Sequence, residues 1–291
     1  MSNLSYLRPM SSIPLVSRAS EVRSLVSNWR ESNSKIALVP TMGALHEGHL
    51  AHLLHARKHA KHVVVSIFVN PTQFAPHEDF ERYPRDISGD MGKLLSTGCA
   101  DLIYAPSIAE IYPDGVLSAP VVHGPASGLE SIFRPHFFGG VVTVVETLFR
   151  HVQPDFATFG EKDYQQLLVV KQLAQELELN IKILAVPTVR ESDGLALSSR
   201  NAYLSSAQRK IAPALFRVLR DVGERVRSGY DIAAAEAEGN AALLNAGFDR
   251  VDYCAVRDSE SLKPVREFRE PCRVLGAAWL GPTRLIDNLA A

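Results

Sequence analysis

Cysteine is scarce in this chain, with only three among 291 residues, at Cys99, Cys254 and Cys272. No two of them form a Cys-x-x-Cys pair, so their spacing indicates neither a zinc site nor a disulfide framework. An odd number of isolated cysteines is typical of proteins in a reducing cytoplasm. We therefore expect three unpaired thiols and a cytoplasmic location.

The chain also lacks an excess of charge and a long hydrophobic run. Its 31 lysines and arginines against 32 aspartates and glutamates leave a net charge of −1, which argues against a nucleic-acid or anionic-membrane partner. No apolar run approaches the roughly 18 residues that a membrane span needs. The longest, residues 63–69, has the length of a strand and contains Ser66. We expect a globular protein with no nucleic-acid partner and no membrane partner.

Strand-like apolar runs alternate with helical patterns through the first two-thirds of the chain. Strands are expected at 35–39, 63–69, 101–104, 155–159 and 181–186. Helices are expected between them at 48–60, 88–96, 140–151 and 164–177. This alternation predicts an α/β fold with a Rossmann-like parallel sheet and helices on both of its faces.

After Pro187 the pattern changes to helices followed by strands. Helices are expected at 205–227 and 232–245, and strands at 250–257, 272–280 and 284–287. This order is typical of a small α+β domain. We therefore predict two domains, residues 1–187 and residues 188–291.

The segment Val39-Pro-Thr-Met-Gly-Ala-Leu-His-Glu-Gly-His49 carries the clearest chemical signal. An apolar run, a glycine-containing turn and a helix start near Gly48 are the parts that bind phosphate at a helix N-terminus. His46 and His49 lie in this turn, where they can donate hydrogen bonds to phosphate and stabilise charge as a phosphoanhydride bond breaks. The pattern His-x-Gly-His resembles the signature of the nucleotidyltransferases, which act on the α-phosphate of ATP and release pyrophosphate.

A longer string, Pro-Thr-Met-Gly-Ala-Leu-His-x-Gly-His at 40–49, resembles the pantothenate synthetase (pantoate–β-alanine ligase) family. Three further segments fit that family in order along the chain. They are Phe-Val-Asn-Pro-Thr-Gln-Phe at 68–74, Gly-Glu-Lys-Asp-Tyr-Gln-Gln at 160–166 and Asp-Gly-Leu-Ala-Leu-Ser-Ser-Arg-Asn at 193–201. The resemblance covers roughly residues 12–285 and is strongest from 38 to 204.

The resemblance implies which residues bind ATP and act on it. It assigns phosphate binding to His46 and a proton-donor or phosphate-stabilising role to His49. The implied catalytic residues are His49, His46, Lys162 and Arg200. The implied ATP ligands are Met42, Gly43, Ala44, Leu45, His46, Glu47, Gly48, His49, Gly160, Glu161, Lys162, Asp163, Val189, Leu197, Ser198, Ser199 and Arg200. Leu197 stands where the family commonly has methionine, and we expect it to serve in packing.

The resemblance assigns pantoate to Gln73 and Gln166, and β-alanine to Gln73. A glutamine amide can donate to a carboxylate or hydroxyl and accept from an amine. The resemblance assigns the Asp163 carboxylate to the ribose hydroxyls of ATP. Gln166 lies one helical turn from Asp163. Gln165 faces about 100° away on the helix and is expected to be structural. Asn70 is expected to shape the turn that carries Gln73.

The reaction that the resemblance implies is the ATP-dependent condensation of (R)-pantoate with β-alanine to pantothenate, through pantoyl adenylate, with release of AMP and pyrophosphate. ATP is then the co-substrate, with Mg²⁺ held mainly by its phosphates. A homodimer is expected, with the domain 188–291 closing over an ATP- and pantoate-binding domain. Two alternatives are a nucleotidyltransferase with a stable adenylylated product and a catalytically silent nucleotide-binding regulator. The intact set of four catalytic residues argues against the regulator.

Six of the ten histidines fall between His46 and His62, which suggests a metal cluster. Helical phase argues against it, because four of them share one face opposite three leucines. These four are His52, His55, His59 and His62, and the leucines are Leu50, Leu53 and Leu54. We predict a solvated histidine stripe.

Several other residues carry weaker signals. The candidates for substrate or phosphate contacts are Arg82, Arg85, Arg134 and His136, and those for Mg²⁺ are Glu78, Asp79 and Asp86. The first twenty residues have arginines, serines and no acidic residue, as in transit peptides. However, the family resemblance begins near Ile13, so we expect a short N-terminal extension with Met10 as an alternative start.

Overall fold

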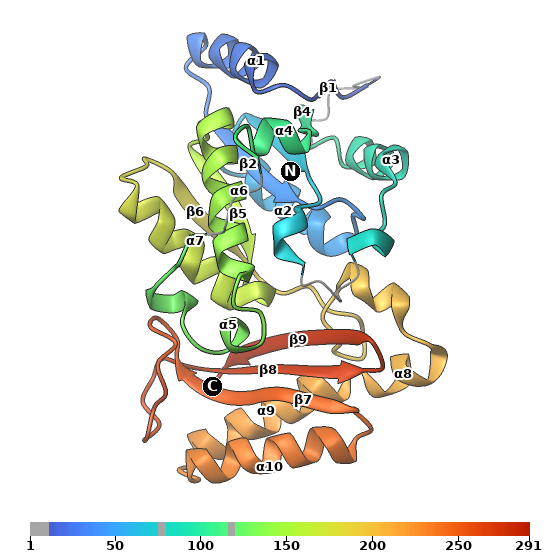
Figure 1. Ribbon diagram of the computed structural model, residues 1–291, viewed down its shortest axis with the longest axis vertical. Coiled ribbons are helices and arrows are strands. Elements are labelled where there is room, and N and C mark those ends of the chain that lie inside the picture. The colour runs from blue at the N-terminus through green and yellow to red at the C-terminus, as the bar shows by residue number, and fades with distance from the viewer. Residues whose placement is uncertain (1–11, 75–79, 116–119) are drawn as a thin grey trace, which may run out of the picture. The chain divides into compact units, whose positions relative to one another are not determined.

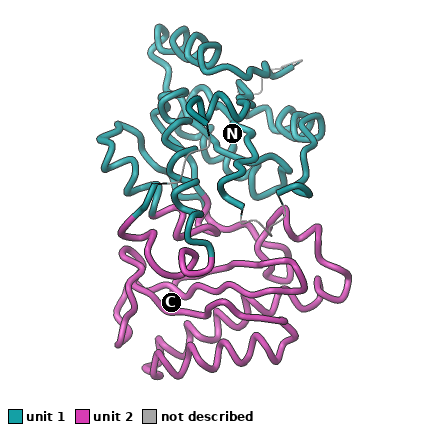
Figure 2. Tube along the Cα trace, in the orientation of Figure 1, with its two compact units in different colours: residues 1–122, 134–159, 169–186 teal, residues 123–133, 160–168, 187–291 magenta. Residues whose placement is uncertain are grey.

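The computed structural model describes residues 12–74, 80–115 and 120–291. The chain forms two compact units (Figure 2). The first comprises residues 1–122, 134–159 and 169–186, and the second comprises residues 123–133, 160–168 and 187–291. The second unit thus includes two short segments from the middle of the chain. The expected N-terminal extension lies outside the described residues, and the functional domains 1–187 and 188–291 stay a prediction.

A six-stranded sheet in the order β1-β4-β3-β2-β5-β6 forms the centre of the first unit (Figure 1). Its strands are β1 (Leu15–Val16), β2 (Ile36–Thr41), β3 (His62–Ile67), β4 (Leu102–Tyr104), β5 (Phe156–Gly160) and β6 (Lys182–Val186). The pairs from β1 to β5 are parallel. The strand order reverses between β2 and β5, which makes this position the topological switch point where such sheets bind ligands.

Helices cover both faces of this sheet because its strands are apolar on both sides. On one face, alternate residues of β2 and β3 form a core with Leu53 of α2 (Glu47–Arg57) and Leu94 of α3 (Ile87–Thr97). On the other face, Phe149 of α6 (Phe137–Val152) meets Phe159 of β5, with ring centroids 6.5 Å apart. The other helices that begin in the first two-thirds of the chain are α1 (Ala19–Glu31), α4 (Ile108–Ile111), α5 (Glu130–Phe133) and α7 (Tyr164–Glu176). The predicted Rossmann-like fold is confirmed.

The second unit contains a three-stranded antiparallel sheet, which bears out the predicted α+β part. Its strands are β7 (Arg250–Asp258), β8 (Cys272–Leu280) and β9 (Thr283–Ala290), in that order. Helices α9 (Ala214–Arg227) and α10 (Ile232–Asn245) share a hydrophobic core with one face. On the opposite face, Leu129 and Leu168 pack with Leu262 and Leu275. The segments 123–133 and 160–168 therefore lie on the face of the sheet that the helices leave open.

The largest difference from the predicted elements concerns the helix expected at 205–227. Pro213 divides it into α8 (Ser206–Ile211) and α9, because proline has no N–H to donate and its ring clashes with the preceding turn. Sequence reasoning also missed α1, whose buried face is marked by Val22 and Val26 four residues apart. Among the described residues, no helix has both the length and the apolar character that crossing a membrane requires.

The turn after β3 lies directly against α6 at Gly140. A Cβ atom at Gly140 would overlap Thr72 Oγ1 and lie 2.9 Å from the Thr72 carbonyl oxygen. The Gly140 carbonyl accepts a hydrogen bond from Asn70 Nδ2 at 3.1 Å. The absence of a side chain at Gly140 thus sets the position of the 3₁₀ turn η1 (Pro71–Gln73).

Gly140→Ala should lower the free energy of unfolding by roughly 1–3 kcal/mol, because the added methyl group must displace the Thr72 backbone. Urea unfolding measures this change. Gly92→Ala in α3 is the matched control, since a Cβ there meets nothing within 4 Å. Better helix propensity should leave that variant neutral or more stable by up to about 1 kcal/mol. Equal stabilities of the two variants would contradict the close packing of η1 on α6.

Candidate active site

The turn between β2 and α2 has an unusual backbone. Gly43 and the following Ala44 both have positive φ angles, +79° and +52°. Glycine adopts this conformation freely, whereas in a residue with a side chain it costs roughly 1–3 kcal/mol. The turn therefore needs partners that hold it in place.

Asp90 of α3 supplies these partners. Its carboxylate accepts hydrogen bonds from the backbone N–H groups of Ala44 at 2.9 Å and Leu45 at 2.7 Å. Asp90 is only 3% exposed, and Lys93 on the same helix donates to the Leu45 carbonyl at 2.6 Å. A Cβ at Gly43 would lie 3.0 Å from the Asp90 carboxylate, so this glycine also permits the approach. The helix α3 thus fixes the backbone that leads into the histidines.

The two histidines of the turn present the same ring atom to the backbone. His46 Nδ1 accepts from the Gly48 N–H at 3.1 Å, and His49 Nδ1 accepts from the His46 N–H at 3.2 Å. Their ring centroids are 4.1 Å apart. An accepting Nδ1 carries no proton, so each neutral ring holds its proton on Nε2. The turn therefore supplies two Nε2–H donors beside the N-terminus of α2, which itself favours anions.

The turn after β3 lies at the same edge of the sheet. Parallel pairing sets Thr41 of β2 opposite Ile67 of β3, so both strands end together. The turns that follow β2 and β3 therefore leave the sheet at the same edge. Asn70 is 1% exposed, and its Oδ1 accepts from the Thr72 N–H and, at 2.6 Å, from the Tyr112 hydroxyl. It shapes the turn, as predicted.

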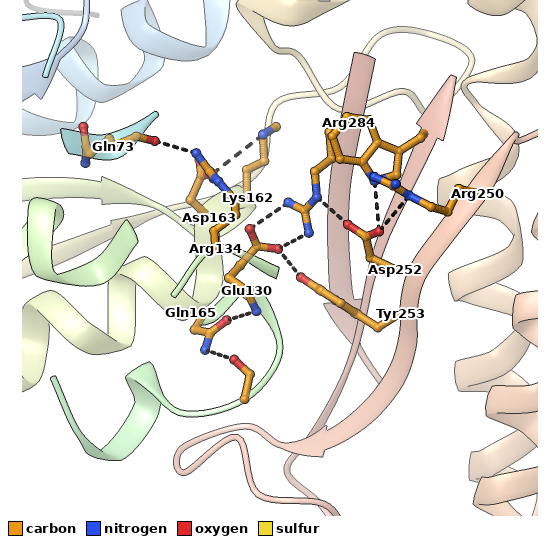
Figure 3. A network of polar contacts seen from close by, with 12 residues as sticks. Gln73, Glu130, Arg134, Lys162, Asp163, Gln165, Arg250, Asp252, Tyr253 and Arg284 are labelled. Atoms are coloured by element: carbon orange, nitrogen blue, oxygen red, sulfur yellow. Dashed lines mark hydrogen bonds and ion pairs between the residues drawn. The ribbon is translucent and has the colours of Figure 1, made fainter. Parts of the chain in front are cut away.

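Arg134 holds the backbone of Gln73. Its Nη2 donates to the Gln73 carbonyl at 2.6 Å (Figure 3). Its guanidinium lies 4.0 Å from the centre of the Phe137 ring. His136 occupies the N-cap position of α6 without a side-chain cap. Arg85 donates to a backbone carbonyl, that of Phe80, at 2.9 Å. Arg134 is thus in direct contact with a predicted substrate residue.

Other predicted site residues lie in the second unit. In the segment Gly160–Asp163, the last three residues form the 3₁₀ turn η4 (Glu161–Asp163). Lys162 Nζ lies 3.8 Å from Asp163 Oδ1 in this turn. Gln166 is half-buried on α7. Its neighbour Gln165 is 4% exposed and accepts from the backbone N–H of Glu130 at 3.1 Å. Gln165 is therefore structural, as expected from its helical phase.

The segment 189–200 folds back on itself. The Leu197 N–H donates to the Val189 carbonyl at 2.9 Å, and the turn η5 (Ser199–Tyr203) begins directly after Ser198. The Ser198 hydroxyl caps that turn by accepting from the Arg200 N–H at 3.3 Å. The predicted residues thus divide between the units. The first holds Met42–His49 and Gln73, and the second holds Gly160–Asp163, Gln166, Val189 and Leu197–Arg200.

The prediction of a solvated histidine stripe is wrong. Helix α2 ends at Arg57, so the helical phase does not extend to His59 and His62. His62 lies in β3 and stacks on Trp29, with ring centroids 4.3 Å apart.

Within α2 the faces also differ from the prediction. His52 is half-buried with its Nδ1 3.2 Å from Thr158 Oγ1 of β5, whereas Leu54 is 52% exposed. His55 is half-buried as well, and burial together with the nearby charge of His59 lowers its pKa. Contact with the sheet determines which side of this short helix is covered, and the histidines lie partly on that side.

Of the three acidic candidates for Mg²⁺, the structure describes only Asp86. Asp86 caps α3 by accepting from the Gly89 N–H at 2.9 Å. Glu78 and Asp79 lie outside the described residues. Among the residues that the structure describes, no group of three or more histidine, cysteine, aspartate and glutamate side chains could hold a metal ion.

A buried ionic network that sequence reasoning missed joins three elements of the second unit (Figure 3). Arg284 donates to the two oxygens of Glu130 at 2.7 and 2.8 Å and to Asp252 at 2.7 Å. The Tyr253 hydroxyl donates to Glu130 at 2.6 Å, and burial raises the pKa of Tyr253. Burial alone would lower the pKa of Arg284, but the Glu130 carboxylate raises it above its ordinary value. The network ties α5 to strands β7 and β9.

Sheet and turn together define a class of protein. The strand order of the parallel sheet reverses between β2 and β5. The N-terminus of α2, with its two histidine donors, directly follows β2. This is the architecture of Rossmann-like α/β proteins of the kind that bind phosphate groups at the first turn.

Comparisons with known proteins identify the family within this class. The model of the pantoate–β-alanine ligase family matches residues 14–290. The pantothenate synthetase of Nitrobacter hamburgensis is 52% identical over 270 residues, which cover 92% of this chain and 95% of that protein. A pantothenate synthetase of Rhodopseudomonas palustris is 50% identical over 284 residues, covering 97% and 100%. This chain therefore belongs to the pantoate–β-alanine ligase family, which confirms the resemblance.

Solved structures agree with this assignment. A pantothenate synthetase from Thermus thermophilus has a TM-score of 0.87 and 44% identity, covering 95% of this chain and 99% of that one. The pantoate–β-alanine ligase from Francisella tularensis, complexed with β–γ ATP and β-alanine, has a TM-score of 0.80 and 33% identity, covering 96% and 98%. Both units of the chain therefore have counterparts in this family of ligases.

Asp90→Asn should destabilise the histidine turn, because an amide group can accept only one of the two backbone N–H bonds and points its own donors at the other. We expect a loss of roughly 1–3 kcal/mol in the free energy of unfolding. Hydrogen exchange of the Ala44 and Leu45 amides should also become faster. Asp86→Asn on the same helix is the control, since asparagine caps a helix as well as aspartate does. Unchanged exchange in the Asp90 variant would show that the turn does not depend on this carboxylate.

Proposed function

We propose that this chain catalyses the ATP-dependent condensation of (R)-pantoate with β-alanine to pantothenate, a step that supplies coenzyme A synthesis. The observation that carries the proposal is the family match over residues 14–290. The pair of Nε2–H donors at the start of α2 supports it chemically, because ATP chemistry requires donors to phosphate oxygens.

In the first step, a carboxylate oxygen of pantoate attacks the α-phosphorus of ATP. A new oxygen–phosphorus bond forms, the bond from the α-phosphorus to the bridging oxygen breaks, and pyrophosphate leaves. Negative charge grows on the leaving oxygens, and preorganised donors stabilise it. We assign this role to the Nε2–H groups of His46 and His49, to the Lys162 ammonium and to the Arg200 guanidinium. The product, pantoyl adenylate, has the leaving group that a free carboxylate lacks.

In the second step, the amine of β-alanine attacks the acyl carbon of pantoyl adenylate. The acyl–oxygen bond breaks, AMP leaves, and the nitrogen gives up a proton as the amide forms. The amine must be neutral, and water must be kept away because it would hydrolyse the adenylate. We assign Gln73 to pantoate and β-alanine and Gln166 to pantoate, because an amide offers both donors and an acceptor to these small substrates.

We further propose ATP as the co-substrate, since the Francisella relative was solved with β–γ ATP and β-alanine. Asp163 would bind the ribose hydroxyls, Val189 would offer backbone groups to the adenine, and Leu197 would pack near the adenine. The remaining ATP contacts would come from Met42–Gly48, Gly160, Glu161, Ser198 and Ser199. Mg²⁺ often binds through substrate phosphates and keeps part of its water shell, and we propose the same arrangement here. Bound in this way, it would neutralise phosphate charge.

A single assay separates this proposal from a simple nucleotidyltransferase and from a silent regulator. Pyrophosphate and AMP are measured with ATP and pantoate, first without and then with β-alanine. A ligase gives sustained release of both products only when the amine is present. Sustained pyrophosphate release without β-alanine would support the transferase, and no release under either condition would support the regulator.

His49→Ala should lower kcat by about 10²- to 10³-fold, because one preorganised donor to the developing charge is lost. The dissociation constant of ATP should change much less, because the interaction strengthens mainly in the transition state. His55→Ala on the same helix is the matched control and should keep nearly normal turnover. A folded His49→Ala protein with normal kcat would contradict the catalytic assignment.

Gln166→Ala and Asp163→Ala should affect different substrates. Loss of the amide leaves a polar group of pantoate without a partner, which weakens that interaction by roughly 1–3 kcal/mol while ATP alone still binds. Loss of the Asp163 carboxylate should weaken ATP itself. Calorimetric titration of ATP into both variants decides the matter. Equal losses of ATP affinity would show that the assignment of Gln166 to pantoate is wrong.

The cytoplasmic location and the homodimer belong to the same proposal. Light scattering of the purified protein tests the homodimer, and fractionation of the cells that express it tests the location.

A further inference from the structure

Two neighbouring residues at the end of the chain, Asp287 and Asn288, lie on strand β9. Side chains of a strand alternate between its two faces, so these two point in opposite directions. Both are buried, with exposures of 4% and 3%. Each contacts a different segment of the second unit that the proposed function assigns to ATP.

Asn288 holds the backbone of the segment 160–163. Its Nδ2 donates to the Glu161 carbonyl at 2.9 Å and to the Lys162 carbonyl at 2.8 Å. Its Oδ1 accepts from Arg273 Nε at 2.5 Å. The Arg273 guanidinium also lies 3.7 Å from the centre of the Tyr164 ring. Both polar atoms of the Asn288 amide are therefore engaged, the nitrogen with η4 and the oxygen with Arg273.

Asp287 holds the beginning of the segment 189–200. It accepts a bidentate pair of hydrogen bonds from Arg190, from Nη1 at 2.6 Å and from Nη2 at 2.9 Å. Arg190 in turn donates to the Gly194 carbonyl at 3.0 Å and stacks over the Phe216 ring at 3.9 Å. Because Arg190 directly follows Val189, this ion pair fixes the start of the segment that ends at Arg200.

We propose that Asp287 and Asn288 are positioning residues for ATP. Strand β9 then acts as a common anchor that sets the segments 160–163 and 189–200 relative to each other within the second unit. The inference rests on the proposed function, which gives those two segments to the nucleotide. Asn288 is chemically specific for its place, because only a group with two donors satisfies two backbone carbonyls at once.

The anchor acts through the backbone next to the residues that are to touch ATP. A misplacement of about 1 Å in a catalytic group can lower a rate about a hundredfold. Asn288 bonds the carbonyl of Lys162 itself, and its loss lets the Lys162 side chain move with its backbone. A purely structural residue would change stability and leave the affinity for ATP unaltered.

The test is Asn288→Asp, which keeps the volume of the side chain but turns an oxygen toward the two carbonyls. We expect the dissociation constant and the KM of ATP to rise about tenfold to a hundredfold, and the KM of β-alanine to change less than twofold. Asp287→Asn, which weakens the pair with Arg190, should act in the same direction. Calorimetry with ATP, steady-state kinetics and thermal unfolding are measured on each purified full-length variant.

Asp252→Asn is the matched control. Asp252 is buried in the same unit and bonds Arg284, but it contacts neither of the two ATP segments. It should lower the melting temperature and leave the affinity for ATP within twofold of the unsubstituted protein. The proposal is overturned if Asn288→Asp loses stability yet binds ATP normally, or if Asp252→Asn weakens ATP binding as much.

These outcomes are distinct from failure of the proposed function. If the unsubstituted protein binds ATP but forms no pantothenate, the ligase proposal fails, and calorimetry still compares the three variants. If it forms pantothenate and the β9 variants bind ATP normally, the ligase proposal stands and the anchor is wrong.

Discussion

The carboxylate of Asp90 is the contact on which the candidate active site depends. It satisfies two backbone N–H groups in a turn where Ala44 has a left-handed conformation that few residues with side chains adopt. The same solution recurs in both units: Asn70 holds the turn after β3, and Asn288 holds the turn after β5. In the histidine turn and the turn after β5 the buried side chain comes from a neighbouring element, whereas Asn70 belongs to the turn that it holds. Loops held in this way keep their geometry before any ligand binds, which is what stabilisation of a transition state requires.

Local chemistry was enough to predict much of this molecule from its sequence. The period of apolar residues located β2, β3, α6 and α10 within a few residues, because these elements are buried and their pattern is strong. Parallel strands end at a common edge of the sheet, so the turns after β2 and β3 leave from the same edge because of the order of the elements. The roles of Asn70 and Gln165 followed from turn chemistry and helical phase.

The features that sequence reasoning missed depend on partners far away along the chain. Asp90 contacts Leu45 and Ala44, which precede it in the chain by 45 and 46 positions. Asn288 contacts Lys162 and Glu161, which precede it by 126 and 127 positions. Glu130 and Arg284 are 154 positions apart, and their pair brings 123–133 into the second unit. An acidic residue on the buried side of α3, one turn before Leu94, was the available signal for Asp90. The histidine stripe failed for the opposite reason, because a local pattern was extended past the end of α2.

The hydrogen bonds within the histidine turn also bear on how His49 acts. The resemblance left two roles open, proton donor and stabiliser of phosphate charge. A proton on Nδ1 of His49 would face the His46 N–H that this atom now accepts, so the doubly protonated ring loses that bond. The same holds for His46 and the Gly48 N–H. A neutral ring keeps the turn intact and still offers its Nε2–H. On the proposed assignment, the geometry therefore favours a His49 that donates a hydrogen bond to phosphate over one that transfers a proton. This agrees with the chemistry of the leaving group, because pyrophosphate needs charge stabilisation more than protonation.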